Sequence, residues 1–266
     1  MDRKLALVTG ASAGIGAAFA RIFASHGYDV ALTARRADRL ERLADEIRLR
    51  HGVETLSLPA DLAEAGACDQ ILRALDAQGR GVDALVNNAG YGLPGVYADT
   101  EWSEQGAALQ VMLVAVCELT HKVLPRMVEN RFGRIINVAS LAGLLPGAAG
   151  HTLYAATKSF LIRFSQSLHL ENQANGVHVS ALCPGFTYSE FHDVNGTRER
   201  VSAATPDWLW LGADEVAAVG YEAVEAGRAM AVPGAPNKAI AAAAKLIPEE
   251  WTLSLAASQG GRFRKL

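Results

Sequence analysis

The segment Leu5-Ala6-Leu7-Val8-Thr9-Gly10-Ala11-Ser12-Ala13-Gly14-Ile15-Gly16 decides the fold of this chain. It opens with an apolar run of strand length and leads through three glycines into an amphipathic stretch. A glycine-rich turn at a helix N-terminus lets a pyrophosphate approach the backbone. The spacing Gly-x-x-x-Gly-x-Gly differs from the ordinary dinucleotide fingerprint, but its place between a strand and a helix predicts a nucleotide site. We expect this site to include Gly10, Ser12, Gly14, Ile15 and Gly16.

The same alternation of apolar runs and amphipathic stretches continues along the chain. Its periodicity predicts strands at Leu5–Thr9, Asp29–Ala34, Glu54–Leu58, Ala84–Asn87, Arg134–Val138, Val177–Cys183 and Ala229–Val232. It predicts helices at Ile15–Ser25, Ala37–Arg50, Glu64–Ala77, Trp102–Glu129, Thr152–Gln173 and Ala213–Ala226. Near-continuous apolar strands separated by helices indicate an α/β fold, a doubly wound parallel sheet flanked by helices on both faces. Ligands of such sheets bind beyond the carboxyl ends of the strands, so the motifs should meet at one edge.

Composition narrows the classes of function. The chain has 266 residues, 50% of them hydrophobic, and we predict a single domain over residues 1–266. A net charge of −3 and a pI of about 6.2 argue against a nucleic acid partner. We expect neither a signal peptide nor a membrane span, and therefore a cytoplasmic protein. Cys68, Cys117 and Cys183 lack metal-ligand spacing, so we expect unpaired buried thiols and no bound metal.

Two arginines follow the second predicted strand, where the adenosine ribose of a dinucleotide should lie. A carboxylate there would accept hydrogen bonds from both ribose hydroxyls, whereas guanidinium groups pair with phosphate in forked geometry. Arg35 and Arg36 therefore favour NADP(H), with its 2′-phosphate, over NAD(H). The alternative is that Arg36 only begins a solvated helix with Asp38 and Arg39.

Further nucleotide contacts are expected after the third and fourth strands. Asp61, which precedes Leu62, could reach the adenine amino group, although an Asp here is also a common helix N-cap. In Asn87-Asn88-Ala89-Gly90 the paired amides and small residues suit close approach of backbone to ligand, although a simple turn has the same composition. We expect Asn88, Ala89 and Gly90 to contact the nucleotide.

A second group of residues predicts chemistry between carbonyls and alcohols. In Tyr154-Ala155-Ala156-Thr157-Lys158 the tyrosine and the lysine share one face, because a helix has about 3.6 residues per turn. A phenol has a pKa of about 10, and a neighbouring ammonium lowers that pKa. The Ser140 hydroxyl could hold a substrate oxygen while charge develops on it. Together the three residues predict a proton-donating site for a carbonyl group.

These motifs together resemble the short-chain dehydrogenase/reductase family. The resemblance runs from Leu5 to about Phe191, and its last element is Pro184-Gly185. It implies a Rossmann-like single domain that uses NADP(H). Tyr154 would donate a proton to the substrate carbonyl or accept one in the reverse direction, Lys158 would bond the nicotinamide ribose, and Ser140 would orient the carbonyl oxygen. The cofactor residues that the resemblance adds or places are Asp61 and Leu62 at adenine, Asn88 near the adenosine-side ribose, and Pro184, Gly185 and Thr187 at the nicotinamide.

The chain departs from the family pattern at one position. Members usually carry an asparagine in the fourth long helix that supports a proton path to the lysine, and here that position is Met112. A thioether cannot make the hydrogen bonds of an amide, but methionine keeps the backbone carbonyl to which the family mechanism assigns part of this role. We therefore expect an altered proton relay without loss of activity.

Residues 189–211 take the place of the family's variable substrate lid. Apolar and aromatic side chains there favour a hydrophobic ketone, aldehyde or alcohol as substrate. Our candidate substrate contacts are His151, Phe186, Phe191, Trp208 and Trp210. Alternatively, both tryptophans pack within the lid or against a neighbouring subunit, and His151 is an exposed loop residue.

We predict an NADP(H)-dependent oxidoreductase that interconverts a hydrophobic ketone or aldehyde and its alcohol. The alternatives are a 3-oxoacyl thioester reductase and a catalytically impaired NADP(H)-binding sensor or scaffold. In this family the two long helices commonly form a dimer or tetramer interface, so we expect a homodimer or homotetramer, with the tail at residues 233–266 as a further contact.

Overall fold

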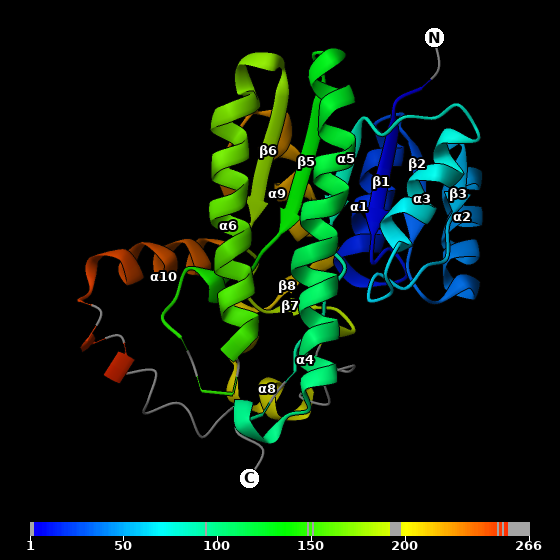
Figure 1. Ribbon diagram of the computed structural model, residues 1–266. Helices are drawn as coiled ribbons and strands as arrows, with labels where there is room; N and C mark the ends of the chain where they lie inside the picture. The colour runs from blue at the N-terminus through cyan, green and yellow to red at the C-terminus, as the bar shows by residue number, and fades with distance from the viewer. Residues whose placement is uncertain are drawn as a thin grey trace.

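A seven-stranded parallel sheet forms the centre of the protein (Figure 1). The computed structural model describes residues 3–93, 95–147, 149–150, 152–191, 198–248, 250–251 and 253–254. The strands follow the order β3-β2-β1-β4-β5-β6-β9. Their bounds are Leu5–Thr9 (β1), Asp29–Thr33 (β2), Thr55–Ser57 (β3), Ala84–Asn87 (β4), Gly133–Val138 (β5), Val177–Leu182 (β6) and Met230–Ala231 (β9). The predicted doubly wound α/β fold is confirmed.

Helices cover both faces of this sheet. One face carries α1 (Gly14–Ser25), α2 (Ala37–His51) and α9 (Ala213–Glu225). The other carries α3 (Ala67–Asp76), α4 (Trp102–Leu109), α5 (Ala115–Glu129) and α6 (Thr152–Asn172). Side chains alternate between the two faces along each strand, so in β1 Ala6 and Val8 enter one core while Leu5 and Leu7 enter the other. Because both faces are covered, all four are fully buried.

A π-helical turn, Gln110–Val114, joins α4 to α5 where the sequence predicts one uninterrupted helix. The whole stretch Trp102–Glu129 has 28 residues and is, among the described residues, the one helix long and apolar enough to cross a bilayer. Core helices of globular proteins meet the same criterion, and Leu119, Val123 and Met127 pack this helix against the sheet. Its inner face therefore belongs to the core of the fold.

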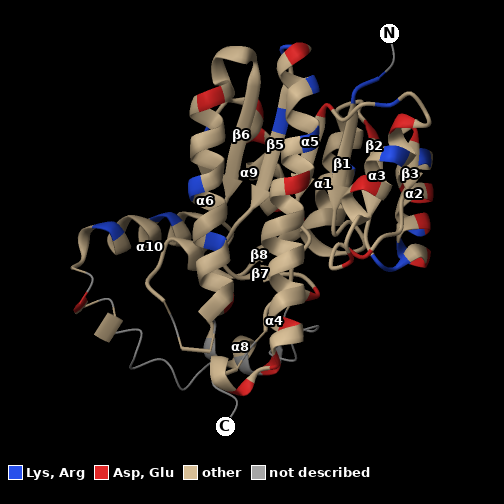
Figure 2. Ribbon diagram, viewed as in Figure 1, with Lys and Arg blue, Asp and Glu red and all other residues tan. Residues whose placement is uncertain are grey.

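Two regions of irregular sequence contain short elements. At the two ends of the lid, β7 (Thr187–Tyr188) pairs in parallel with β8 (Leu211–Gly212), and within the lid α8 spans Arg198–Ala204. The alanine-rich tail forms α10 (Ala235–Leu246), a helix that is not among those predicted from the sequence. Charged side chains of both signs are interspersed over α2 and α3 and are sparser along α4 and α6 (Figure 2).

The three cysteines are free thiols. Cys68 and Cys183 are buried as expected, whereas Cys117 is partly exposed. In the part of the chain that the structure describes, no group of three or more His, Cys, Asp or Glu side chains could hold a metal ion.

Candidate active site

A cavity of about 700 Å³ lies at the carboxyl edge of the sheet. The loops that follow β1 to β6 all contribute to its wall. Of the candidate site residues, those lining it are Gly10, Ser12, Gly14, Ile15, Arg35, Arg36, Asp61, Leu62, Asn88, Ala89, Gly90, Ser140, Tyr154, Lys158, Pro184, Gly185, Phe186, Thr187 and Phe191. The structure thus brings together motifs that lie up to 181 positions apart in the sequence (191 − 10).

The glycine-rich turn is held against the loop after β4. Gly10 and Gly14 have φ angles of 65° and 55°, in the left-handed region that favours glycine. The Asn88 side-chain amide donates to Thr9 O at 3.0 Å and to Gly10 O at 3.3 Å. The first turn of α1 carries no side-chain cap. Its backbone N–H groups therefore remain available to an anionic group at the turn.

Gly16 packs behind this turn and is not among the described residues that line the cavity. A Cβ atom at Gly16 would lie 2.3 Å from Gly10 O and 2.6 Å from Asn88 Nδ2. Because glycine has no Cβ atom, Gly16 permits close contact between α1 and the turn. The expected direct contact of Gly16 with a nucleotide stays a prediction.

The arginines after β2 differ in their surroundings. Arg35 is exposed, whereas Arg36 precedes α2 and donates to Ser12 Oγ from Nη2 at 2.9 Å. Arg36 also forms an ion pair with Glu190, as does Arg39 one turn along α2. No motif in the sequence points to Glu190, and Arg39 is expected only as part of a solvated helix. The spacing of Arg36 and Arg39 could have placed both guanidinium groups on one face.

Asp61 lines the cavity and also acts as a local cap. Its Oδ1 accepts a hydrogen bond from Ala63 N at 3.0 Å. The next helix, α3, begins at Ala67 with Gly66 as its N-cap, so Asp61 caps a turn that precedes the helix and is not its N-cap. The contact of Asp61 with adenine stays a prediction.

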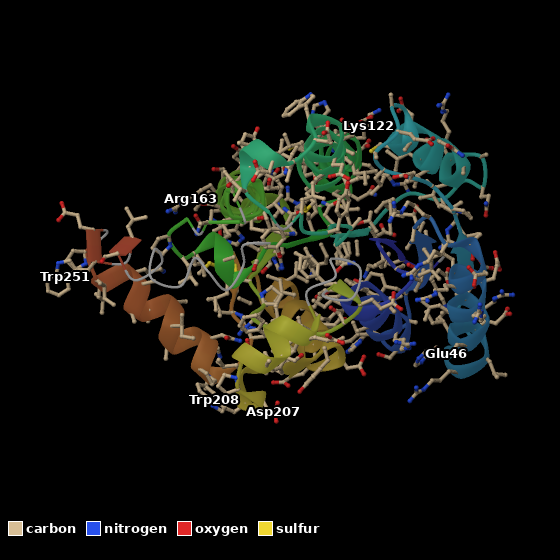
Figure 3. All side chains as sticks on the ribbon, turned by 90° about the horizontal axis from the view of Figure 1, so that it is seen from below. Glu46, Lys122, Arg163, Asp207, Trp208 and Trp251 are labelled. Carbon is tan, nitrogen blue, oxygen red and sulfur yellow. The ribbon has the colours of Figure 1, made fainter. Side chains whose placement is uncertain are left out.

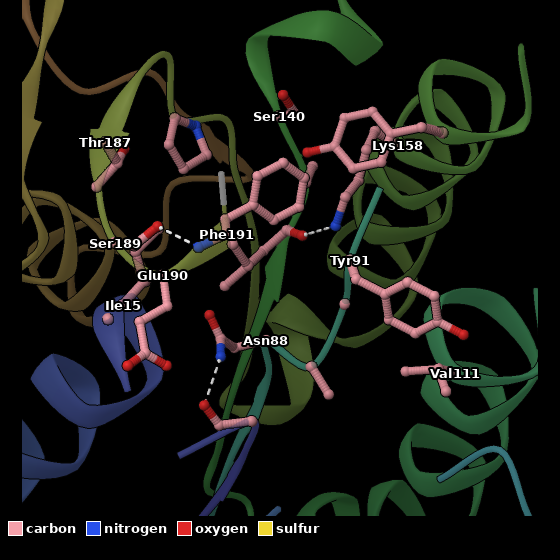
Figure 4. A pocket seen from close by; sticks show the side chains of 18 of the residues that line it. Ile15, Asn88, Tyr91, Val111, Ser140, Lys158, Thr187, Ser189, Glu190 and Phe191 are labelled. Atoms are coloured by element: carbon pink, nitrogen blue, oxygen red, sulfur yellow. Dashed lines mark hydrogen bonds between the residues drawn. The ribbon is translucent and has the colours of Figure 1, made fainter. Parts of the chain in front are cut away.

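Ser140 lies immediately beyond β5, at the start of a 3₁₀ turn (Leu141–Gly143). Its Oγ accepts from Ala142 N at 3.1 Å. The next residue, Leu141, donates its backbone N–H to Pro184 O at 2.8 Å. The ends of β5 and β6 thereby fix the serine at the cavity wall (Figure 4).

Tyr154 and Lys158 lie one turn apart on α6 and both line the cavity. Burial raises the pKa of Tyr154 to about 12, and a hydrogen bond with the Ser140 side chain opposes part of that rise. Burial lowers the pKa of Lys158 to about 8. The Lys158 Nζ atom donates to Val138 O at 2.7 Å. The expectation that the ammonium lowers the tyrosine pKa is not met here, because desolvation of the phenol is the largest influence on it.

Met112 lies beside the lysine, in the π-helical turn. A Cβ atom at Gly90 would be 3.2 Å from Met112 Sδ and 3.8 Å from Lys158 Nζ. The methionine side chain is buried among apolar residues of α4, α5 and the sheet. Turns of this kind are rare and recur at functional sites.

The candidate substrate residues separate into two groups. Phe186 and Phe191 line the cavity, and the Phe191 ring lies 5.6 Å from the Tyr154 ring, centroid to centroid. Trp210 is buried within the lid, 5.0 Å from the stacked Tyr188 ring, and Trp208 is 65% exposed. Figure 3 shows Trp208 at the periphery of the molecule. Neither tryptophan is among the described cavity residues, and Trp210 packs against Tyr188 and Phe186. Contact of either tryptophan with a substrate stays a prediction. His151 lies outside the described residues.

Comparisons with known proteins agree with this geometry. The model of the short chain dehydrogenase family matches residues 4–199. Nodulation protein G of Rhizobium meliloti is 37% identical over 224 residues, 82% of this chain and 88% of the relative. The very-long-chain 3-oxoacyl-CoA reductase of Anas platyrhynchos is 34% identical over 194 residues, 71% of this chain and 62% of the relative. A short-chain dehydrogenase from Sphingobium yanoikuyae, solved in complex with NADPH, superposes with a TM-score of 0.79 at 29% identity, covering 97% of this chain and 94% of that one.

Proposed function

The chain belongs to the short-chain dehydrogenase family and is an oxidoreductase of carbonyl and alcohol groups, and on that premise we propose that it uses NADP(H) to interconvert a hydrophobic ketone or aldehyde and its alcohol. One observation carries the proposal. Ser140, Tyr154 and Lys158 line the same cavity as the glycine-rich turn and Arg36. Proton donation and nucleotide binding would thus occur within one site.

The cavity residues fit a phosphorylated dinucleotide. Backbone N–H groups at the uncapped start of α1 would bind the pyrophosphate. Arg36, which borders the cavity beyond β2, would pair with the 2′-phosphate, and Asp61 would approach adenine. The NADPH bound to the Sphingobium yanoikuyae relative supports this choice of cofactor.

The side chains on α6 and after β5 would donate the proton and stabilise the resulting charge. When bound, the nicotinamide supplies or accepts the hydride. Tyr154 stays protonated at neutral pH because its pKa is about 12, so it would act as the donor to a developing alkoxide. The Ser140 hydroxyl would orient the same oxygen, and the Lys158 ammonium would stabilise the phenolate that remains.

Apolar walls support a hydrophobic substrate. The described apolar residues on the substrate side of the cavity are Val111, Leu141, Leu145, Pro146, Phe186, Phe191 and Val201. We assign the described parts of the lid, residues 189–191 and 198–211, to this surface. The sequence similarity to a very-long-chain 3-oxoacyl-CoA reductase favours a 3-oxoacyl thioester as the second candidate substrate.

The test is NADPH oxidation by the purified protein with a panel of apolar ketones, aldehydes and 3-oxoacyl thioesters. We expect NADPH to be preferred to NADH, and Tyr154→Phe to lower turnover by about 10²- to 10⁴-fold while NADPH affinity stays within a few-fold. Tyr188→Phe is the matched control, because Tyr188 is exposed and outside the cavity lining. Tight NADPH binding without turnover on any substrate would favour a sensor or scaffold instead.

We further propose a homodimer or homotetramer in the cytoplasm, assembled through α5 and α6. Val114, Phe160 and Leu170 expose apolar side chains on these helices or on the turn that precedes α5. Light scattering coupled to gel filtration should give two or four times 28.2 kDa. Leu170→Glu should lower that mass if α6 forms the interface.

A further inference from the structure

Glu190 forms ion pairs with Arg36, which precedes α2, and with Arg39 in the first turn of α2. Its Oε2 lies 2.8 Å from Arg36 Nη2, and its Oε1 accepts a hydrogen bond from Arg39. The contact links residues 151 to 154 positions apart (190 − 39 and 190 − 36). Figure 4 shows Glu190 extending from the loop that also carries Ser189 and Phe191.

The neighbours of Glu190 lie across the same cavity. A Cβ atom at Gly14 would be 2.8 Å from Ser189 Cβ, so this segment touches the glycine-rich turn. On the other side, the Phe191 ring contacts Tyr154. Residues 189–191 therefore extend from the expected pyrophosphate position to the catalytic tyrosine, with the Glu190 carboxylate at the arginines.

Arg36 is the side chain that we assign to the 2′-phosphate, and it is already engaged by a carboxylate of the chain. Carboxylate and phosphate are the two anions that a guanidinium group binds in forked geometry. Resting on the proposed use of NADP(H), we infer that Glu190 is an internal competitor for the 2′-phosphate and thereby sets the affinity for phosphorylated against unphosphorylated dinucleotides.

The geometry favours exchange of one anion for the other. Arg36 Nη2 contacts two acceptors, Ser12 Oγ at 2.9 Å and Glu190 Oε2 at 2.8 Å, so the guanidinium group is shared between them. A phosphate has more acceptor oxygens and a larger charge than a carboxylate, so it can satisfy both arginines. The Arg36 and Glu190 side chains are 40% and 38% exposed, so water screens the pair that must be broken.

The test is calorimetric binding of two fragments that contain no nicotinamide: 2′,5′-ADP, which carries the 2′-phosphate, and 5′-AMP, which lacks it. Glu190→Gln should bind 2′,5′-ADP about three- to ten-fold more tightly than the wild type, the range set by two exposed ion pairs. Its affinity for 5′-AMP should be unchanged. Asp207→Asn removes the same charge from an exposed position of the lid outside the cavity lining and should leave both affinities unaltered.

The outcomes separate this inference from the proposed function. Equal or weaker binding of 2′,5′-ADP to Glu190→Gln, with Arg36→Ala abolishing the preference for 2′,5′-ADP, would overturn the competitor role and leave NADP(H) use intact. A tightening of both fragments alike would also overturn it, since the effect would not depend on the 2′-phosphate. If the wild type and Glu190→Gln both fail to prefer 2′,5′-ADP to 5′-AMP, the assignment of NADP(H) falls and the inference falls with it.

Discussion

The Nζ atom of Lys158 lies 5.6 Å from the centroid of the Tyr154 ring. Its hydrogen bond goes to Val138 O, at the end of β5. Burial shifts the two pKa values in opposite directions, raising that of Tyr154 to about 12 and lowering that of Lys158 to about 8. The tyrosine is thereby kept as an acid, and the lysine becomes the group whose charge changes near physiological pH.

The first prediction is a pH-dependent stability contribution from Lys158. Its pKa is about 8 in the folded protein against an ordinary value of 10.5, so between these values the unfolded chain binds more protons. The free energy of unfolding therefore rises with pH in this window. Relative to Lys158→Met, the wild type should gain about 2 kcal/mol between pH 7.5 and pH 10, measured by urea denaturation.

Two features make this measurement specific. Taking the difference between wild type and variant removes contributions from other groups, including Tyr154, whose raised pKa costs stability only above about pH 10. Lys238→Met, at an exposed position of α10, is the control for replacing a lysine by methionine. A flat profile for Lys158→Met would mean that the ammonium is not desolvated.

The second prediction concerns Met112→Asn. The amide would enter an apolar environment beside Gly90, so we expect a loss of about 1–3 kcal/mol in the free energy of unfolding. Turnover should change by less than about five-fold, because the backbone carbonyl at this position is kept. Met112→Leu, which lacks polar atoms, is the control for packing. A rise in turnover of more than ten-fold for the asparagine variant alone would show that the proton relay limits the present enzyme.

Local patterns in the sequence predicted most of the fold. Each predicted strand has its counterpart in the sheet, and β1 and β4 have the predicted bounds. The order of the strands did not follow from those patterns, because it depends on crossovers between distant segments. The π-helical turn at Gln110–Val114 was missed since its apolar periodicity matches that of an ordinary helix.

Site residues were predictable where a motif fixes both residue type and position. Gly10, Ser140, Tyr154 and Lys158 all line the cavity. Glu190 was not predicted, because its partners Arg36 and Arg39 lie at the start of α2 and only the tertiary structure brings the lid to them. The role of the lid tryptophans stayed open for a related reason: aromatic residues suit a ligand surface and a local core equally well.

The third prediction tests the packing role of Gly16. Gly16→Ala places a methyl group 2.3 Å from Gly10 O, which forces the turn away from α1. We expect denaturation to show a loss of about 1–3 kcal/mol in the free energy of unfolding. Fluorescence titration should show a larger dissociation constant for NADPH. Gly147→Ala is the control, since among the described residues no atom beyond the chain neighbours lies within 4 Å of the added Cβ. Equal effects of the two variants would contradict the close contact.

The fourth prediction compares the two lid tryptophans. Trp210 is 7% exposed and stacks on Tyr188, with Phe186 at 5.5 Å, whereas Trp208 is 65% exposed. If the lid unfolds together with the domain, Trp210→Ala should lower the free energy of unfolding by about 3–5 kcal/mol. Where the lid opens locally, the loss should appear as faster hydrogen exchange at β7 and β8. Trp208→Ala should change stability by less than about 0.5 kcal/mol and leave exchange unaltered.

Because Phe186 lines the cavity, Trp210→Ala should also raise KM for apolar substrates. A larger KM effect from Trp208→Ala would instead place the exposed tryptophan at the substrate.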